Sequence, residues 1–202
     1  MCGYKYAGKS TAGRLLSGAL GFERTRLAGP IKRTAVACGV PVECVDGSEE
    51  AKERPLPMLG GRSARHFMEQ LGDWGRATYG ADFWLRQWAA EADALLAQGR
   101  TLVLVDDLRY DDEDDFLAAW AAARGVPYLL LQVSAPDRED QRASHRSNRV
   151  PEPARVARCI DNSRAACPLE ADLRARVIHA VDSWNARLRG GLAPAAGRTP
   201  RW

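Results

Sequence analysis

The sequence has few lysines, few histidines and no long apolar run. Only four of its 29 basic residues are lysines. The three histidines are scattered and the five cysteines lack metal-ligand spacing, so the pattern excludes a zinc-finger type of site. The cysteines are therefore expected to be free, reduced thiols in a cytoplasmic protein. No segment reaches the roughly 18 apolar residues of a membrane-spanning helix, and no membrane partner is expected.

Charge and composition are ordinary for a globular protein. The net charge of +3 is small and spread along the chain, so it does not predict binding to a nucleic-acid polymer. A chain of 202 residues suits one α/β domain, which we place at 1–189. The remainder, 190–202, is rich in Gly, Pro and Ala and is predicted to be disordered.

Apolar periodicity predicts a chain of helices and strands. The predicted helices are 9–20, 30–38, a segment that starts at the N-cap Ser63, 82–98, 112–124 and 169–187. Trp84 and Trp88 fall on one face of the fourth of these and are interpreted as core residues. The segment 39–62 is predicted to be rich in loops, because prolines, glycines and a charge cluster interrupt it.

Two short apolar runs, 102–105 and 126–133, are predicted to be buried parallel strands. Strands that alternate with helices indicate a three-layer α/β fold with a mostly parallel sheet flanked by helices. Asp106 and Asp107 follow the first of these strands, where a site is expected at the end of a parallel sheet.

The strongest motif is Gly3 to Ser10, which fits G-x-x-x-x-G-K-[ST] at every fixed position. Glycines let the backbone turn its N–H groups toward phosphate oxygens, and a helix dipole points at the same place. Lys9 would reach the β and γ phosphates, and the Ser10 hydroxyl would bind Mg²⁺. The motif thus predicts binding of ATP with Mg²⁺. The predicted phosphate-binding residues are Gly3, Lys5, Ala7, Gly8, Lys9, Ser10 and Thr11.

A phosphate-binding loop ordinarily follows a strand, yet only Met1 and Cys2 precede Gly3. The first strand is therefore expected to be truncated, with the true start lying upstream; the alternative is a loop held in some other way.

Phosphoryl transfer depends on positioning and charge neutralisation. Asp107, and less so Asp106, would lie in the outer shell of Mg²⁺ or orient an acceptor, and Arg109 would bind a second phosphate. The arginine-rich segment within 134–158 is expected to be a mobile lid over the transferring phosphate.

Several further segments resemble the deoxynucleoside monophosphate kinases of bacteriophages and prophages. They are Leu27–Lys32, Lys52–Pro55, Arg65–Arg76, Asp82–Trp84, Asp107–Glu113 and Ile160–Asn162. The resemblance covers most of residues 1 to 175. It implies a P-loop kinase fold, a homodimer, and ATP-dependent phosphorylation of deoxynucleoside monophosphates.

The resemblance also implies an acceptor site within 39–98 and nearby residues. Its residues would be Lys32, Arg65, Gln70, Arg76 and Arg109, with Trp74 or Trp84 near the base. The chain departs from the family in the lid, where Ala135 replaces an arginine. Arg138 or Arg142 would substitute for it.

On this interpretation Lys9, Arg109 and Asp107 are the catalytic residues. Two alternatives stay open. One is a kinase of the same fold that acts on another small phosphorylated metabolite, such as phosphomevalonate. The other is a nucleotide-binding protein without transfer activity.

Overall fold

The structure is a computed structural model that describes residues 1–4, 6–137, 150–156 and 158–163, together with five single positions between 175 and 186. The chain divides into two compact units. The first comprises Met1–Thr25 and Arg100–Trp202, and the second comprises Arg26–Gly99. No helix in the described part of the chain is long and apolar enough to cross a membrane.

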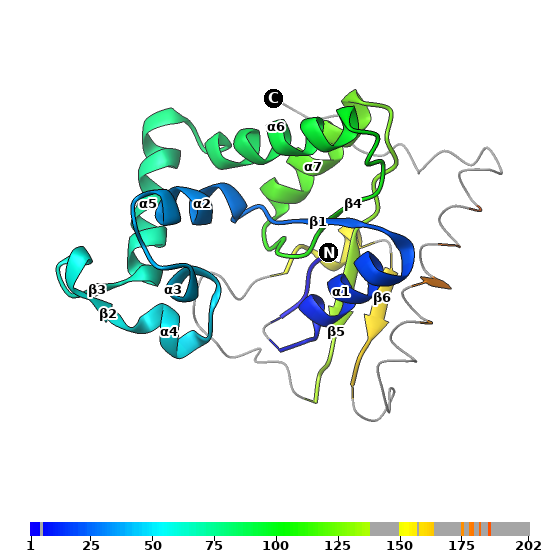
Figure 1. Ribbon diagram of the computed structural model, residues 1–202. Helices are drawn as coiled ribbons and strands as arrows, with labels where there is room; N and C mark the ends of the chain where they lie inside the picture. The colour runs from blue at the N-terminus through cyan, green and yellow to red at the C-terminus, as the bar shows by residue number, and fades with distance from the viewer. Residues whose placement is uncertain are drawn as a thin grey trace. The chain divides into compact units, whose positions relative to one another are not determined.

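The first unit combines short parallel strands with helices (Figure 1). Its elements are α1 (Lys9–Leu20), β1 (Glu23–Thr25), β4 (Val103–Val105), α7 (Asp111–Ala123), β5 (Leu131–Ser134), the short 3-10 helix η2 (Pro153–Arg155) and β6 (Arg158–Asp161). Strand β1 pairs in parallel with β4, and β5 pairs in parallel with β6. The predicted α/β class is therefore confirmed.

The backbone of Met1 and Cys2 joins these two strand pairs. The Met1 nitrogen donates to the Val105 oxygen of β4 at 2.6 Å. Cys2 donates to the Leu131 oxygen at 2.9 Å and accepts from the Val133 N–H at 2.9 Å, both in β5. The two residues thus run between β4 and β5, in parallel with β5. They occupy the place of a strand that leads directly into the glycine loop.

Helix α1 follows its sequence pattern closely. It spans Lys9–Leu20 and ends at Gly21, whose φ of 71° is the left-handed conformation that glycine favours at helix ends. Ala12 and Leu16 are buried and pack in one cluster with apolar residues of β4, β5 and β6. The helix therefore covers the strands with its apolar face, as the periodicity predicted.

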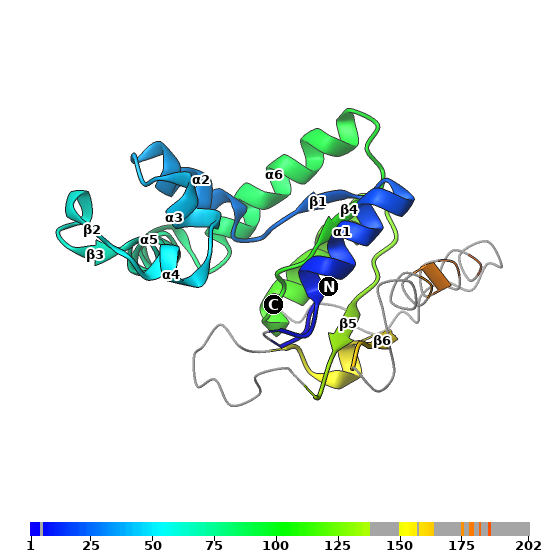
Figure 2. The ribbon, with the colours of Figure 1, turned by 60° about the horizontal axis from the view of Figure 1, so that its bottom comes forward.

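The second unit is mainly helical (Figure 2). It contains α2 (Gly29–Ala37), α3 (Val42–Asp46), α4 (Glu49–Glu53), β2 (Pro55–Leu56), the 3-10 helix η1 (Pro57–Leu59), β3 (Arg62–Ser63), α5 (Ala64–Tyr79) and α6 (Phe83–Ala97). Helices α2, α3, α4 and α5 pack on one another around an apolar cluster that includes Val40, Cys44 and Val45. Strands β2 and β3 form a small antiparallel pair.

Two helix signals of this unit are confirmed. The Ser63 hydroxyl accepts from the His66 N–H at 3.2 Å and caps α5 as predicted. Trp84 and Trp88 are buried in α6, and the Trp84 indole N–H donates to the Gly72 oxygen at 3.1 Å. The tryptophan stripe is therefore core, as interpreted from the sequence.

Two predictions were wrong in detail. The segment 39–62 holds two short helices rather than loops alone, because the Ser48 hydroxyl caps α4 and Cys44 and Val45 of α3 are buried. Strand β5 begins five residues later than the predicted start at 126. The Val126 N–H instead donates to the Ala121 oxygen at the end of α7. Pro127 has no N–H that could form a hydrogen bond with a neighbouring strand.

Other predictions fall largely outside the described residues. These are the lid residues from 138 to 149, the tail 190–202 and most of the helix 169–187, of which five single positions are described. Each of those five is helical. The single-domain boundary at 189 stays a prediction.

Replacing Trp88 with alanine should destabilise the second unit strongly. Trp88 is 1% exposed, and truncation of such a buried ring costs about 3–5 kcal/mol. Trp74→Ala is the matched control, since Trp74 is 51% exposed and its loss should cost less than about 1 kcal/mol. Urea unfolding followed by far-UV circular dichroism measures both; equal losses would contradict the assignment of Trp88 to the core.

Candidate functional site

The loop Gly3 to Ser10 has a backbone that requires glycine at two positions. Gly3 has a φ of 147° and Gly8 a φ of 101°, both outside the range of ordinary residues. A Cβ atom on Gly3 would lie 2.2 Å from the Val133 oxygen, and one on Gly8 would lie 2.4 Å from the Asn162 amide nitrogen. Tyr6, with a φ of 67°, also adopts the left-handed conformation. The motif glycines are thus fixed by close contacts as well as by torsion angles.

Lys9 lies folded over this loop. Its ammonium donates to the Gly3 oxygen at 2.6 Å and to the Tyr4 oxygen at 2.7 Å. Gly8 is the N-cap of α1 and offers no side chain to the amides of the first turn. Ser10 is exposed in that turn. A cation, a hydroxyl and the positive end of a helix therefore meet at one loop, which is the chemistry that binds an anion.

Asn162 holds the loop from the sheet. It follows β6, and its backbone N–H donates to the Ser134 oxygen at 2.6 Å. Its side-chain amide donates to the Ala7 oxygen at 2.9 Å and is buried. Asn162 lies in one of the segments that resemble the kinase family, but no role was predicted for it, because 155 residues separate it from Ala7.

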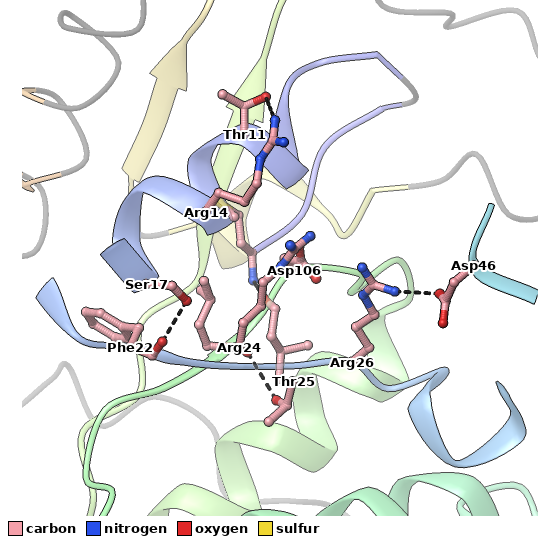
Figure 3. A network of polar contacts seen from close by, with 12 residues as sticks. Thr11, Arg14, Ser17, Phe22, Arg24, Thr25, Arg26, Asp46 and Asp106 are labelled. Atoms are coloured by element: carbon pink, nitrogen blue, oxygen red, sulfur yellow. Dashed lines mark hydrogen bonds and ion pairs between the residues drawn. The ribbon is translucent and has the colours of Figure 1, made fainter. Parts of the chain in front are cut away.

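Asp106 is a buried carboxylate that forms an ion pair with the partly buried Arg24. The Arg24 Nε donates to Asp106 Oδ2 at 2.6 Å, and Arg24 Nη2 contacts the same oxygen (Figure 3). A Cβ atom on Gly13 would lie 3.0 Å from this oxygen, so Gly13 lets α1 approach the pair closely. Asp106 therefore neutralises Arg24. Asp107, the residue favoured from the sequence, follows it at the end of β4 and is half-buried.

Glu113 caps the turn that carries Arg109. Its carboxylate accepts from the Arg109 N–H at 2.7 Å and from the Tyr110 N–H at 3.1 Å. Burial raises the pKa of Glu113 to about 7, and the charges of Asp107 and Asp112 add to this, while the two N–H bonds oppose it. The predicted site residues Asp107 and Arg109 thus border a carboxyl that titrates near neutrality.

Arg155 binds the acidic first turn of α7. Its guanidinium lies 3.1 Å from Asp111 and 3.3 Å from Asp114, and it also contacts Asp115 at 2.5 Å. These carboxylates raise the pKa of Arg155. Tyr128 donates to Asp114 at 2.6 Å. Nothing in the sequence pattern marked Arg155, which attaches the end of the predicted lid segment to α7.

The predicted acceptor residues of the second unit are in ion pairs. Lys32 Nζ donates to Asp46 at 2.6 Å, and Arg26 donates to the same oxygen at 2.8 Å. Burial would raise the pKa of Asp46, but the hydrogen bonds and charges of Lys32 and Arg26 outweigh it and lower that pKa. Arg65 contacts Glu49 at 2.8 Å and also contacts Glu53.

The remaining predicted acceptor residues lie on α5 and α6. Arg76 pairs with Asp73 at 2.7 Å, and Gln70 is exposed. Trp74 and Trp84 line a cleft of about 380 Å³. Its other lining residues are Pro30, Arg33, Thr34, Phe83, Gln87 and Glu91. The aromatic residues predicted near a base thus share one cleft, while Trp84 is also part of the core.

Three predicted site residues, Lys5, Arg138 and Arg142, lie outside the described residues. Among the residues that are described, no group of three or more His, Cys, Asp or Glu could hold a metal ion. Neither a protein-family model nor a curated protein matches this chain.

Replacing Arg24 with methionine should destabilise the first unit by about 3–5 kcal/mol, because it removes the cation facing a buried carboxylate. Arg100→Met is the matched control. Arg100 pairs with Glu23 at 2.6 Å on the surface, and loss of such a pair costs at most about 1 kcal/mol. The additional change Asp106→Asn should recover part of the loss. Urea unfolding measures all three variants, and equal costs at Arg24 and Arg100 would refute the buried pair.

The stability contribution of Glu113 should fall as the pH rises. Its pKa is about 7 in the folded chain against an ordinary value of 4.5, so the folded chain binds this proton more tightly. The contribution is therefore complete below pH 4.5 and is lost as the pH rises through 7, by up to about 3 kcal/mol. Glu113→Gln lacks this titration. The difference in unfolding free energy between wild type and Glu113→Gln, measured from pH 4.5 to 8, should change by that amount; a constant difference contradicts the shift.

Proposed function

We propose that this chain is an ATP-dependent phosphotransferase that converts deoxynucleoside monophosphates to diphosphates. The observation that carries the proposal is the loop Gly3 to Ser10. It has the full motif, two glycines in conformations that only glycine takes without strain, and a helix that starts at its lysine. The short parallel pairing of Cys2 with β5 supports it, because such loops follow a parallel strand.

On the donor side, the loop amides and Lys9 would bind the phosphates of ATP. The Lys9 ammonium would exchange the Gly3 and Tyr4 oxygens for phosphate oxygens, so the cation is already at the loop before ATP arrives. Magnesium fits this surface, since it commonly takes one or two protein oxygens and completes its shell with phosphates and water. The exposed Ser10 hydroxyl would supply one oxygen, and Asp107 would act through water.

On the acceptor side, the phosphate of a deoxynucleotide would attack the γ phosphorus of ATP in line, yielding ADP and a deoxynucleoside diphosphate. The acceptor is already an anion, so no general base is required. Arg109 would neutralise the charge that accumulates between the two nucleotides. The resemblance adds Lys32, Arg65 and Arg76 of the second unit to the proposed acceptor-binding residues, and each of them is in an ion pair within that unit.

The choice of acceptor follows the resemblance, so the test is a panel of acceptors. ADP release should be measured with ATP, Mg²⁺ and each deoxynucleoside monophosphate, phosphomevalonate or no acceptor. We expect turnover with at least one deoxynucleoside monophosphate. Turnover with another phosphorylated metabolite alone would change the acceptor class, and ATP binding without any ADP release would favour a nucleotide-binding protein.

Lys9→Ala should lower kcat by a factor of at least about 10³ and change the unfolding free energy by no more than about 1 kcal/mol. The reason is that Lys9 supplies charge to the transferring phosphate, whereas its contacts in the fold are to two loop carbonyls. Coupled ADP release and urea unfolding measure the two effects. Lys52→Ala, at a lysine outside the loop, is the control. Turnover of Lys9→Ala within tenfold of wild type would remove the loop from the mechanism.

A further inference from the structure

The peptide between Ala7 and Gly8 is held by a hydrogen bond from Asn162. The Asn162 amide donates to the Ala7 oxygen at 2.9 Å, and the same nitrogen would lie 2.4 Å from a Cβ atom on Gly8. Asn162 is 8% exposed, and its own N–H is bonded to Ser134 in β5. The sheet therefore determines where this donor lies, independently of the loop.

A fixed carbonyl also fixes the direction of the next N–H. The peptides in the described part of the chain are trans. In a planar trans peptide the N–H points to the side opposite the C=O. Because the Ala7 oxygen points to Asn162, the Gly8 N–H points away from Asn162. Gly8 is the N-cap of α1, and its N–H, like those of Lys9 and Ser10, lacks an acceptor within the helix.

Without the hydrogen bond from Asn162, the plane of this peptide could rotate by about half a turn. Glycine adopts positive and negative φ with similar ease, so Gly8 permits rotation of the preceding peptide plane. The rotated peptide would present the Ala7 oxygen, rather than the Gly8 N–H, to a bound anion. A carbonyl oxygen repels a phosphate, whereas an N–H binds it. Gly8, which the loop requires, thus also allows the neighbouring peptide to present a carbonyl oxygen to the anion in place of its N–H.

We infer that Asn162 is a positioning residue that holds the Gly8 N–H toward the phosphates of ATP, an inference that rests on the proposed function. Its role is to keep one amide aimed before the anion arrives, so that binding needs no reorganisation at this peptide. Asn162 acts through Gly8 and does not itself touch the nucleotide.

The test is Asn162→Asp in the full chain. Aspartate has nearly the same size, but its carboxylate cannot donate to the Ala7 oxygen. The Kd for ATP and the Kd for inorganic tripolyphosphate should both rise at least tenfold, because one hydrogen bond to the phosphates is lost and the new carboxylate also repels them. Asn162→Leu has a similar size, cannot donate and adds no charge, and it should still raise both values about tenfold. Equal factors for the two ligands locate the effect at the phosphates. In turnover, the KM for ATP should rise while the KM for the acceptor stays within twofold.

Asp161→Asn is the matched control, because it makes a one-atom change at the exposed preceding residue, the last of β6. Its Kd for both ligands should stay within twofold of wild type. A Kd for ATP within twofold of wild type in the uncharged variant Asn162→Leu overturns the inference, even if that variant melts at a lower temperature. Absence of ATP and tripolyphosphate binding in the wild type would instead overturn the proposed function.

A second measurement needs no variant. In the ¹⁵N-labelled wild-type chain, the Gly8 amide proton should move downfield when ATP is added, because it gains a charged acceptor. A Gly8 resonance that stays in place while ATP binds overturns the inference, including the case in which Asn162→Asp fails to fold.

Discussion

The first unit depends on the hydrogen bonds that Met1 and Cys2 make on both sides. Their backbone bonds to Val105 in β4 and to Leu131 and Val133 in β5. These bonds connect the β1–β4 pair to the β5–β6 pair. Gly3 follows at once and lies so close to Val133 that a side chain would collide with it. The loop therefore leaves the sheet at a fixed point and in a fixed direction. Asn162 fixes the other end from β6, and the shape of the loop follows from strand pairing.

The same unit limits its own negative charge. Asp106 is buried but faces the guanidinium of Arg24, and Glu113 is half-buried with a pKa raised to about 7. Asp111, Asp114 and Asp115 share Arg155. A site proposed for a triphosphate would lose affinity beside uncompensated carboxylates. The unit instead pairs its acids with arginines, or raises the pKa of one by burial, while Lys9 sits at the loop.

Local patterns in the sequence predicted local structure well. The bounds of α1, its glycine end, the Ser63 cap and the burial of Trp88 all follow from residues within one or two turns of each other. The helices within 39–62 were missed because burial of Cys44 and Val45 offsets the prolines and glycines around them. Contacts across the chain could not be predicted. Arg24 and Asp106 are 82 residues apart in the sequence, and Asn162 and Ala7 are 155 residues apart. Apolar periodicity predicts no such pairs.

The thiol of Cys2 offers a chemical measure of how stably the first residues pair with the sheet. Its side chain is fully buried, and its thiol lies 3.6 Å from the Leu131 oxygen. Burial raises the pKa of this thiol to about 11, so it stays protonated and reacts slowly with alkylating reagents. Cys38 and Cys159, by contrast, are exposed. The rate at which Cys2 becomes labelled therefore reports how often the backbone before the loop separates from the sheet. Labelling of this thiol thus measures a local opening equilibrium.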